Sequence, residues 1–195
     1  GKNKLLWARL STMYATNASG NFFLPEPDDE VVVGFMNEDP GHPIILGGVY
    51  GERHKPPYEY EAKNNMKAIV TREKMRIEFN EEKRVITIST PGKNTVEISD
   101  GDKHIKLTDQ NKNEIVMNSS GISLLSAKDI ILKAKGAITM DATSKFSATA
   151  KQDVSLEGLN VNMQAKVSAV VKGNAKAELS ASGQTIVKGA MVMIN

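Results

Sequence analysis

The chain of 195 residues has no cysteine, few aromatic residues and no long apolar run. The missing cysteines exclude a disulfide framework and a thiolate metal site, and they suit assembly in a reducing cytoplasm. No apolar run approaches the roughly 18 to 20 residues that span a bilayer. The opening GKNKLLWARL holds no hydrophobic segment of signal-peptide length. We therefore expect assembly in the cytoplasm and, if the protein leaves its cell, ejection without a signal peptide.

The charge is nearly balanced, and no cluster of reactive side chains stands out. Lys and Arg total 25 and Asp and Glu 23, so the net charge of +2 does not indicate a nucleic-acid partner. His42, His54 and His104 are far apart, without the spacing of a metal site, and we interpret them as surface or loop residues. Residues 28–30 are an acidic turn, and no serine lies in a nucleophile elbow. The sequence predicts no enzyme, cofactor or metal site.

Aromatic residues, 5% of the chain, divide it into two parts. After residue 60 only Phe79 and Phe146 occur, which predicts a conventional core in the front part alone. Short segments rich in β-branched and aromatic residues alternate there with turn signals, as in a small all-β barrel. We expect this barrel over residues 1–50 and a linker over 51–65. The expected barrel strands are Leu5–Leu10, Phe22–Leu24, Glu30–Met36 and Ile44–Tyr50.

From residue 66 the apolar residues recur in pairs two positions apart. From residue 122 these pairs repeat every eight residues, with a one-residue deletion at Gly158, and the looser earlier pairs begin at Met75/Ile77. An i, i+2 pair places both side chains on one face of a strand, whereas a helix would have no apolar stripe. The regular pairs, which we predict form the core, include Ile122/Leu124, Ile130/Leu132, Ile138/Met140, Phe146/Ala148, Val154/Leu156 and Val161/Met163.

An eight-residue repeat is too short to enclose a core by itself. A strand of about five residues and a corner of three supplies one wall, whereas single-chain solenoids use coils of about 20 residues or more. Three copies winding about one axis would supply the other walls, each chain passing to the next face with each repeat. The sequence therefore predicts an all-β homotrimer, with a triple-stranded β-helix over residues 66–195 about 75 Å long at roughly 4.7 Å per strand.

Residues 20–57, GNFFLPEPDDEVVVGFMNEDPGHPIILGGVYGERHKPP, resemble the oligomer-binding-type (OB-type) barrel of the VgrG and phage baseplate spike family. The likeness lies in the aromatic pair and proline, the acidic turn, EVVVGF, the DPGHP turn, ILG and VY. Residues 64–79 are similar to the start of the family's triple-stranded β-helix. The ending GQTIVKGAMVMIN is similar to the tip of its type VI secretion members.

This resemblance implies a membrane-puncturing spike of a contractile injection machine, which touches its target membrane transiently. It also implies a small cap of the PAAR type at the C-terminal end and hub or tube proteins above the barrel. The first barrel strand and the preceding hub domain of the family have no counterpart, so we expect a fragment of a longer protein. No lysozyme-like insertion and no C-terminal HxH pair occur. The residues expected to bind the tip partner are Met191, Val192, Met193, Ile194 and Asn195.

Two other functions are compatible with parts of the sequence. An OB-type barrel can bind single-stranded nucleic acid through stacked aromatic residues such as Trp7 and Phe22, but the acidic turns at residues 26–30 and 38–39 would repel phosphate. A trimeric fibrous adhesin or phage fibre shaft shares the physics of the repeat. The barrel motif favours the spike, since a fibre has no need of it.

Overall fold

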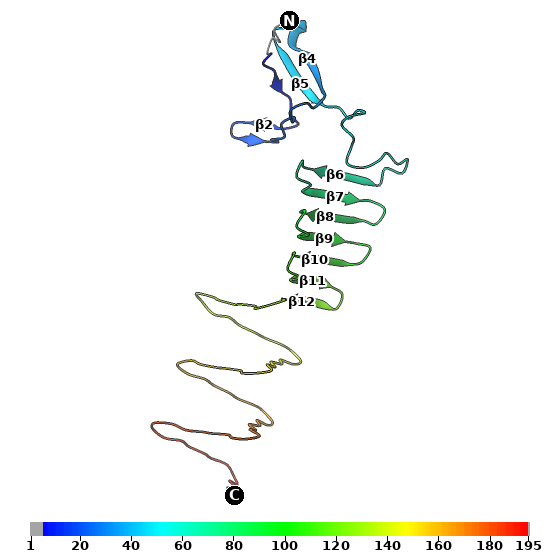
Figure 1. Cartoon of the computed structure of the whole chain (residues 1–195). Coiled ribbons are helices and arrows are strands. Elements are labelled where there is room, and N and C mark those ends of the chain that lie inside the picture. The colour runs from blue at the N-terminus through cyan, green and yellow to red at the C-terminus, as the bar shows by residue number, and fades with distance from the viewer. Residues whose placement is uncertain (1–5, 195) are drawn as a thin grey trace. The chain divides into compact units, whose positions relative to one another are not determined.

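The computed structural model describes residues 6–194 and is built of β-strands and irregular segments, with no α-helix in that range (Figure 1). The predicted all-β class is therefore confirmed. By its contacts the chain separates into two compact units, Gly1–Lys133 and Ala134–Asn195. Every strand of residues 6–194 lies in the first unit, and the second unit follows an extended path.

The N-terminal strands form a small open sheet. Strand β4 (Val31–Phe35) pairs antiparallel with β5 (Pro43–Gly48), and β1 (Arg9–Leu10) adds to the other edge of β5 in parallel. Two of the four predicted barrel strands are thus present almost in full. Between β4 and β5 the chain reverses through a single 3-10 turn, in which Asn37 has a φ of 52°.

The barrel predicted for this region is not closed. Strands β2 (Ala15–Thr16) and β3 (Ser19–Gly20) form a separate two-stranded sheet. Residues Phe22–Leu24, predicted as a strand, form none, because Pro25 and Pro27 follow at once and lack the amide hydrogen that a ladder needs. Of the predicted strand Leu5–Leu10 only the last two residues are in a strand, and Leu5 lies outside the described residues.

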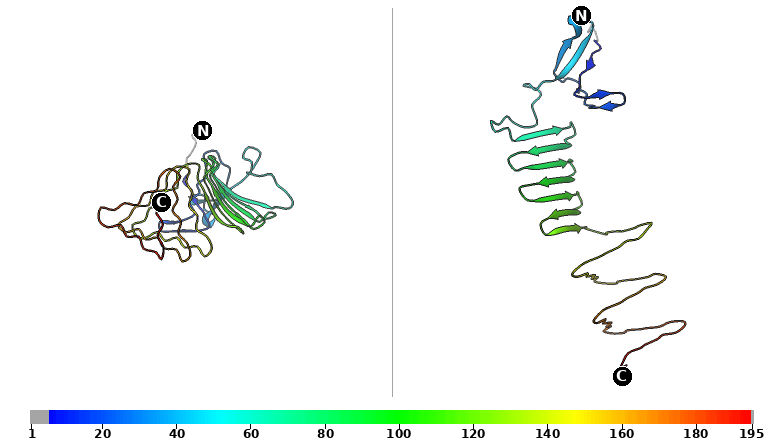
Figure 2. Two further views of the ribbon diagram at one scale, coloured as in Figure 1. Left: turned by 90° about the horizontal axis from the view of Figure 1, so that it is seen from below. Right: turned by 180° about the vertical axis from the view of Figure 1, so that it is seen from behind.

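Residues 66–125 form a seven-stranded antiparallel meander in which each strand pairs with the next along the chain (Figures 1 and 2). All seven strands are five residues long, and their side chains alternate between the two faces. The strands are β6 (Met66–Val70), β7 (Arg76–Asn80), β8 (Val85–Ser89), β9 (Thr95–Ser99), β10 (His104–Thr108), β11 (Glu114–Asn118) and β12 (Gly121–Leu125).

The turns explain why this part of the chain folds back on itself. Lys74, Lys93 and Lys112 lie 19 residues apart and have φ angles of 64°, 64° and 67°, and on the other edge Arg84 and Lys103 have φ angles of 55° and 52°. A left-handed residue at the end of a short turn reverses an extended chain. The two-strand unit of 19 residues therefore pairs within one chain, whereas the sequence predicted that each repeat passes to the next face.

One of the looser apolar pairs is also corrected by the structure. Met75, read with Ile77 as the first pair, lies before β7 in the turn, and the pair on β7 is Ile77/Phe79. The error arose because Met75 keeps the i, i+2 spacing but belongs to the segment that reverses the chain.

Residues 126–194 contain bends but no strand, and their coloured trace follows wide open loops in Figures 1 and 2. The bends lie at residues 127–128, 135–136, 143–144, 151–152, 159, 166–167, 174–175, 182–183 and 190. Their spacing is eight residues, except for a single step of seven between 159 and 166. The period of the bends is the period of the apolar pairs, and the short step falls directly after Gly158, where the sequence shows its deletion.

Over residues 6–194 a single copy of this chain has no hydrophobic core. No hydrophobic side chain is buried in the described part, and the accessible surface is 19184 Å². A compact protein of 21.2 kDa would expose about 9,100 Å². The single chain therefore leaves far more surface in water than a compact protein of its mass does.

Candidate assembly interface

One face of the meander is a continuous apolar surface. Ile77 faces Ile88 across β7 and β8, and Ile88 faces Val96 across β8 and β9. The pairing continues in this way down the sheet in two parallel columns. The first column is Phe79, Ile86, Ile98, Ile105, Met117 and Ile122, and the second is Ile69, Ile77, Ile88, Val96, Leu107, Ile115 and Leu124.

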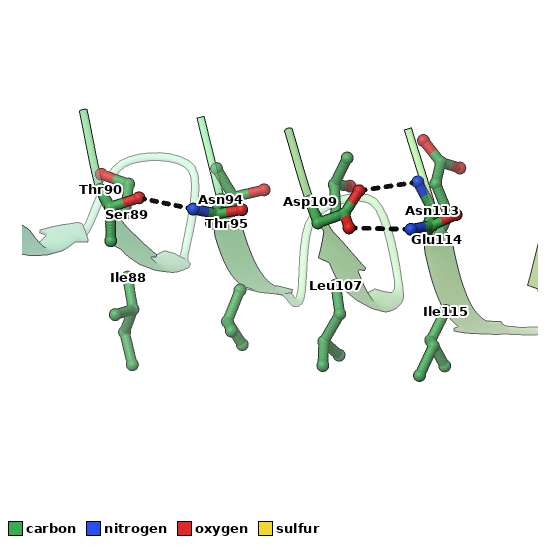
Figure 3. Close-up of a pocket in the computed structure, with 12 residues that line it drawn as sticks. Ile88, Ser89, Thr90, Asn94, Thr95, Leu107, Asp109, Asn113, Glu114 and Ile115 are labelled. Atoms are coloured by element: carbon green, nitrogen blue, oxygen red, sulfur yellow. Dashed lines mark hydrogen bonds between the residues drawn. The ribbon is translucent and has the colours of Figure 1, made fainter. Parts of the chain in front are cut away.

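The apolar side chains of this face are aligned across neighbouring strands, but no other described segment of the single chain covers them. Most of its side chains remain about 40% exposed, and Ile122 at the last strand is 74% exposed. Figure 3 shows Ile88, Leu107 and Ile115 pointing the same way, away from a row of polar side chains at the turns. Cross-strand apolar pairs stabilise a sheet when one face is buried. The geometry is that of a sheet face made for burial against another protein surface.

The opposite face of the meander is mostly polar and carries side-chain contacts between neighbouring strands. Glu97 Oε1 lies 2.7 Å from His104 Nε2, and Lys106 Nζ lies 3.0 Å from Glu114 Oε1. Exposed pairs of this kind contribute little stability. The polar side chains thus lie on the face opposite the two apolar columns.

The predicted core residues differ in how far the structure brings them together. Ile122 and Leu124 lie on β12 at the lower ends of the two columns. The others, from Ile130 to Met163, have no strand partner and remain exposed in the single chain. Sequence reasoning missed Ile69 and Phe79, whose signal was the alternation of apolar and polar residues along β6 and β7. The remaining predicted core residues are Ile130, Leu132, Ile138, Met140, Phe146, Val154, Leu156, Val161 and Met163.

The predicted tip residues form an exposed apolar end of the second unit. Met191, Val192, Met193 and Ile194 are all more than half exposed, and Asn195 lies outside the described residues. Four consecutive apolar side chains in water are unfavourable, at about 25 cal/mol for each Å² of apolar surface. A surface of this kind is typical of a contact site.

The titratable groups of the described residues form local contacts. Asp39 Oδ1 accepts a hydrogen bond of 2.8 Å from the Gly41 amide, and Asp39 Oδ2 lies 2.8 Å from His42 Nδ1. The Gly41 amide first, and then His42, hold the pKa of Asp39 below its ordinary value of 3.8. Asp29 closes the acidic turn by accepting from the Glu26 amide at 2.8 Å. Within residues 6–194 no group of three or more His, Cys, Asp or Glu side chains is placed to bind a metal ion.

Comparison with known proteins found similarity in the N-terminal region. Residues 1–50 match the model of the type VI secretion system/phage-baseplate injector OB domain. The chain is 38% identical over 61 residues to the type VI secretion system spike protein VgrG1a of Pseudomonas aeruginosa, an alignment that covers 31% of this chain and 10% of that protein. It is 40% identical over 52 residues to the actin cross-linking toxin VgrG1 of Vibrio cholerae, covering 27% of this chain and 5% of the toxin.

A third similar protein is the type VI secretion system spike protein VgrG3 of Vibrio cholerae, 36% identical over 52 residues, or 27% of this chain and 5% of that protein. The chain thus spans a tenth or less of the curated relatives that it matches here. Within the described residues there is no helix of the length and apolar character needed to cross a membrane.

Proposed function

We propose that this chain, whose residues 1–50 match the injector OB domain, is part of the structural, membrane-puncturing spike of a contractile injection machine. The machine is of the type VI secretion or phage-tail kind. The observation that carries the proposal is the combination of this injector domain with an apolar sheet face that a single chain leaves uncovered.

Association of three copies of the chain is the simplest way to bury the apolar face. A single sheet with one apolar face needs cover on that face only, and three such sheets around an axis give a prism with an apolar interior and three polar outer faces. The outward face would then carry the Glu97–His104 and Lys106–Glu114 pairs. This arrangement supports a homotrimer over residues 66–125.

The bends in residues 126–194 support a second mode of assembly in the same trimer. A chain that bends every eight residues without reversing lays one strand on each face of a triangular prism in turn. Its backbone N–H and C=O groups would then find partners on the other two chains, since buried backbone groups must be paired. The result is the triple-stranded β-helix, with one apolar pair of each repeat on the axis.

The mechanical role follows from this pairing. A shaft in which every strand bonds to strands above and below has no hinge, because local opening would break many hydrogen bonds together. The exposed residues 191–194 at the end of the chain suit a small apolar cap such as a PAAR-like protein, and the injector domain suits a hub or tube. The spike would assemble in the bacterial cytoplasm and leave the cell by ejection, touching the target membrane transiently.

The injector domain also separates this proposal from the alternative of a fibrous adhesin or tail fibre. A fibre shaft shares the repeat but has no need of a baseplate domain.

The mass in solution tests the proposal directly. Native mass spectrometry of the full chain should give a particle of three times 21.2 kDa. Small-angle scattering should give a long dimension of at least about 75 Å, from about 16 strands on each face at roughly 4.7 Å. A stable monomer, or a trimer of compact shape, contradicts the spike.

A further inference from the structure

The three five-residue turns on one edge of the meander have the same hydrogen-bonding pattern, so their fifth residues are structurally equivalent. The turns Thr71–Met75, Thr90–Asn94 and Asp109–Asn113 are each closed by a hydrogen bond from the first N–H to the fifth C=O, of 3.0, 3.1 and 3.1 Å. In two of them the fifth residue is asparagine, whose side chain can both donate and accept. Met75 in the first turn has no such side chain.

Each asparagine is fixed by its own turn and binds the next segment of chain. Asn94 Nδ2 donates to Thr90 Oγ1 at 3.0 Å, and Asn94 Oδ1 accepts from the Gln110 amide at 3.1 Å. Asn113 Nδ2 donates to Asp109 Oδ2 at 2.8 Å, a bond drawn in Figure 3. Both carboxamides therefore tie one turn to the chain that lies beside it.

The segment that Asn113 binds is no longer a turn of the meander. Asn113 Oδ1 accepts from the Ala127 amide at 3.0 Å. Ser126 Oγ lies 3.1 Å from both Asn113 Oδ1 and the Asp129 carbonyl oxygen, and its one hydroxyl hydrogen is donated to one of the two. Ser126 Oγ also accepts from the Lys128 amide at 3.2 Å. Ser126 directly follows the last strand, and residues 127–128 are the first of the bends spaced eight residues apart. Asn113 thus holds the first corner of the C-terminal region.

The turn that precedes that corner is shorter than its predecessors. The turn between Asn118 and Gly121 has two residues, whereas the two preceding turns on that edge have four. The separation from asparagine to bound amide accordingly falls from 16 residues at Asn94 to 14 at Asn113. The same contact is therefore kept at the point where the chain stops reversing.

We infer that Asn113, oriented by Asp109, is the positioning residue that sets the register in which each chain passes from its own meander into the shared shaft. This inference rests on the proposed trimer. In a strand a slip of one residue moves every side chain to the other face. With Ser126 and Ala127 held, Ile130 and Leu132 face the axis. A slip by one would bring Ile131 and Lys133 inward instead.

Thiol accessibility measures this register, because the natural chain has no cysteine. In the full chain, Ile131→Cys should react with a water-soluble maleimide at least about tenfold faster than Ile130→Cys. Adding Asn113→Ala should bring the two rates to within about twofold, while the particle remains a trimer. Adding Asn94→Ala, the matched change one unit earlier, should leave the tenfold difference intact.

Amide hydrogen exchange gives a second readout with its own variant. Loss of a hydrogen bond to a carboxamide should speed exchange at Ala127 by about tenfold in Asn113→Ala. Ser126→Ala, which leaves the meander untouched, should speed exchange at Lys128 and keeps the test valid if Asn113→Ala does not fold. A trimer in which Asn113→Ala changes neither the labelling ratio nor the exchange overturns the role of Asn113 alone. A monomeric parent overturns the role of Asn113 and the proposed function together.

Discussion

Residues 66–125 and residues 126–194 carry the same alternating apolar pairs, yet only the first region pairs with itself. In the first, left-handed residues such as Lys93 close the turns, and the chain reverses after each strand. In the second, no described residue has a φ in the left-handed region, and the chain bends every eight residues without reversing. The comparison shows that the corners, rather than the strands, decide whether the chain folds back on itself.

The largest effect should come from a charge on the predicted axis of the C-terminal region. We expect Ile130→Asp to abolish trimerisation, because three carboxylates would meet without a counter-charge and each buried charge costs several kcal/mol. Ile131→Asp is the matched control, since it changes the same residue type one position along, on the predicted outer side. Ile138→Asp should behave as Ile130→Asp does. The measurement is the mass in solution together with the melting temperature.

Equal behaviour of the two variants would contradict the predicted inner and outer positions of the repeat. If Ile130→Asp and Ile131→Asp are both trimeric with the parent's melting temperature, the eight-residue repeat does not define an inside and an outside.

A large-to-small change tests the apolar face of the meander. Ile98→Ala removes a side chain that lies between Ile86 and Ile105 in the first column, and it should cost about 2 to 5 kcal/mol per chain once that face is buried. Glu97→Ala, the neighbour on the polar face, should cost less than about 1 kcal/mol. Chemical denaturation of the full chain measures both. A cost for Ile98→Ala as small as that for Glu97→Ala would mean that the face stays in water.

The sequence predicted the strands of the meander better than their connections. Apolar pairs such as Ile86/Ile88 are visible by their spacing of two, which is a property of the strand alone. The reversals at Lys74, Lys93 and Lys112 were missed, because lysine is not a residue that favours a left-handed backbone. Their 19-residue spacing was the available signal, and only a search for a two-strand unit would have found it.

The candidate interface was predictable in kind but not in extent. Ile122 and Leu124 were assigned to the core from their repeat, and they lie at the end of the apolar columns. The Asn113 carboxamide meets the Ala127 amide 14 residues on, past a two-residue turn, whereas Asn94 meets the Gln110 amide 16 residues on, past a four-residue turn. No periodicity in the sequence specifies which carboxamide such a turn brings beside which amide.

Substitutions of the left-handed turn residues should change the stability by a smaller amount, upward or downward according to the new residue. Lys93→Gly should stabilise the full chain by up to about 1 kcal/mol, because glycine takes a φ of 64° without steric cost. Lys93→Val should destabilise it by about 1 kcal/mol or more, since a β-branched residue opposes that backbone. Gly136, at a bend of the C-terminal region without a left-handed φ, is the control position. There Gly136→Ala should change the melting temperature little.

The smallest effect concerns the pH dependence of stability that Asp109 contributes from a turn of the meander. The Asn113 amide lies 2.9 Å from Asp109 Oδ1, and this bond, aided by the side chains of Asn113 and Asn111, holds the pKa of Asp109 below its ordinary 3.8. Because the folded pKa lies below the unfolded one, the stabilisation is complete above pH 3.8 and is lost as the pH falls through the folded pKa. Asp109→Asn should remove this acid dependence, and a carboxyl titration followed by NMR should place the midpoint of Asp109 below 3.8. A midpoint at or above 3.8 would mean that the hydrogen bonds of the turn do not stabilise the ionised carboxylate of Asp109. The reversing corners would then not differ from the bending corners in this interaction.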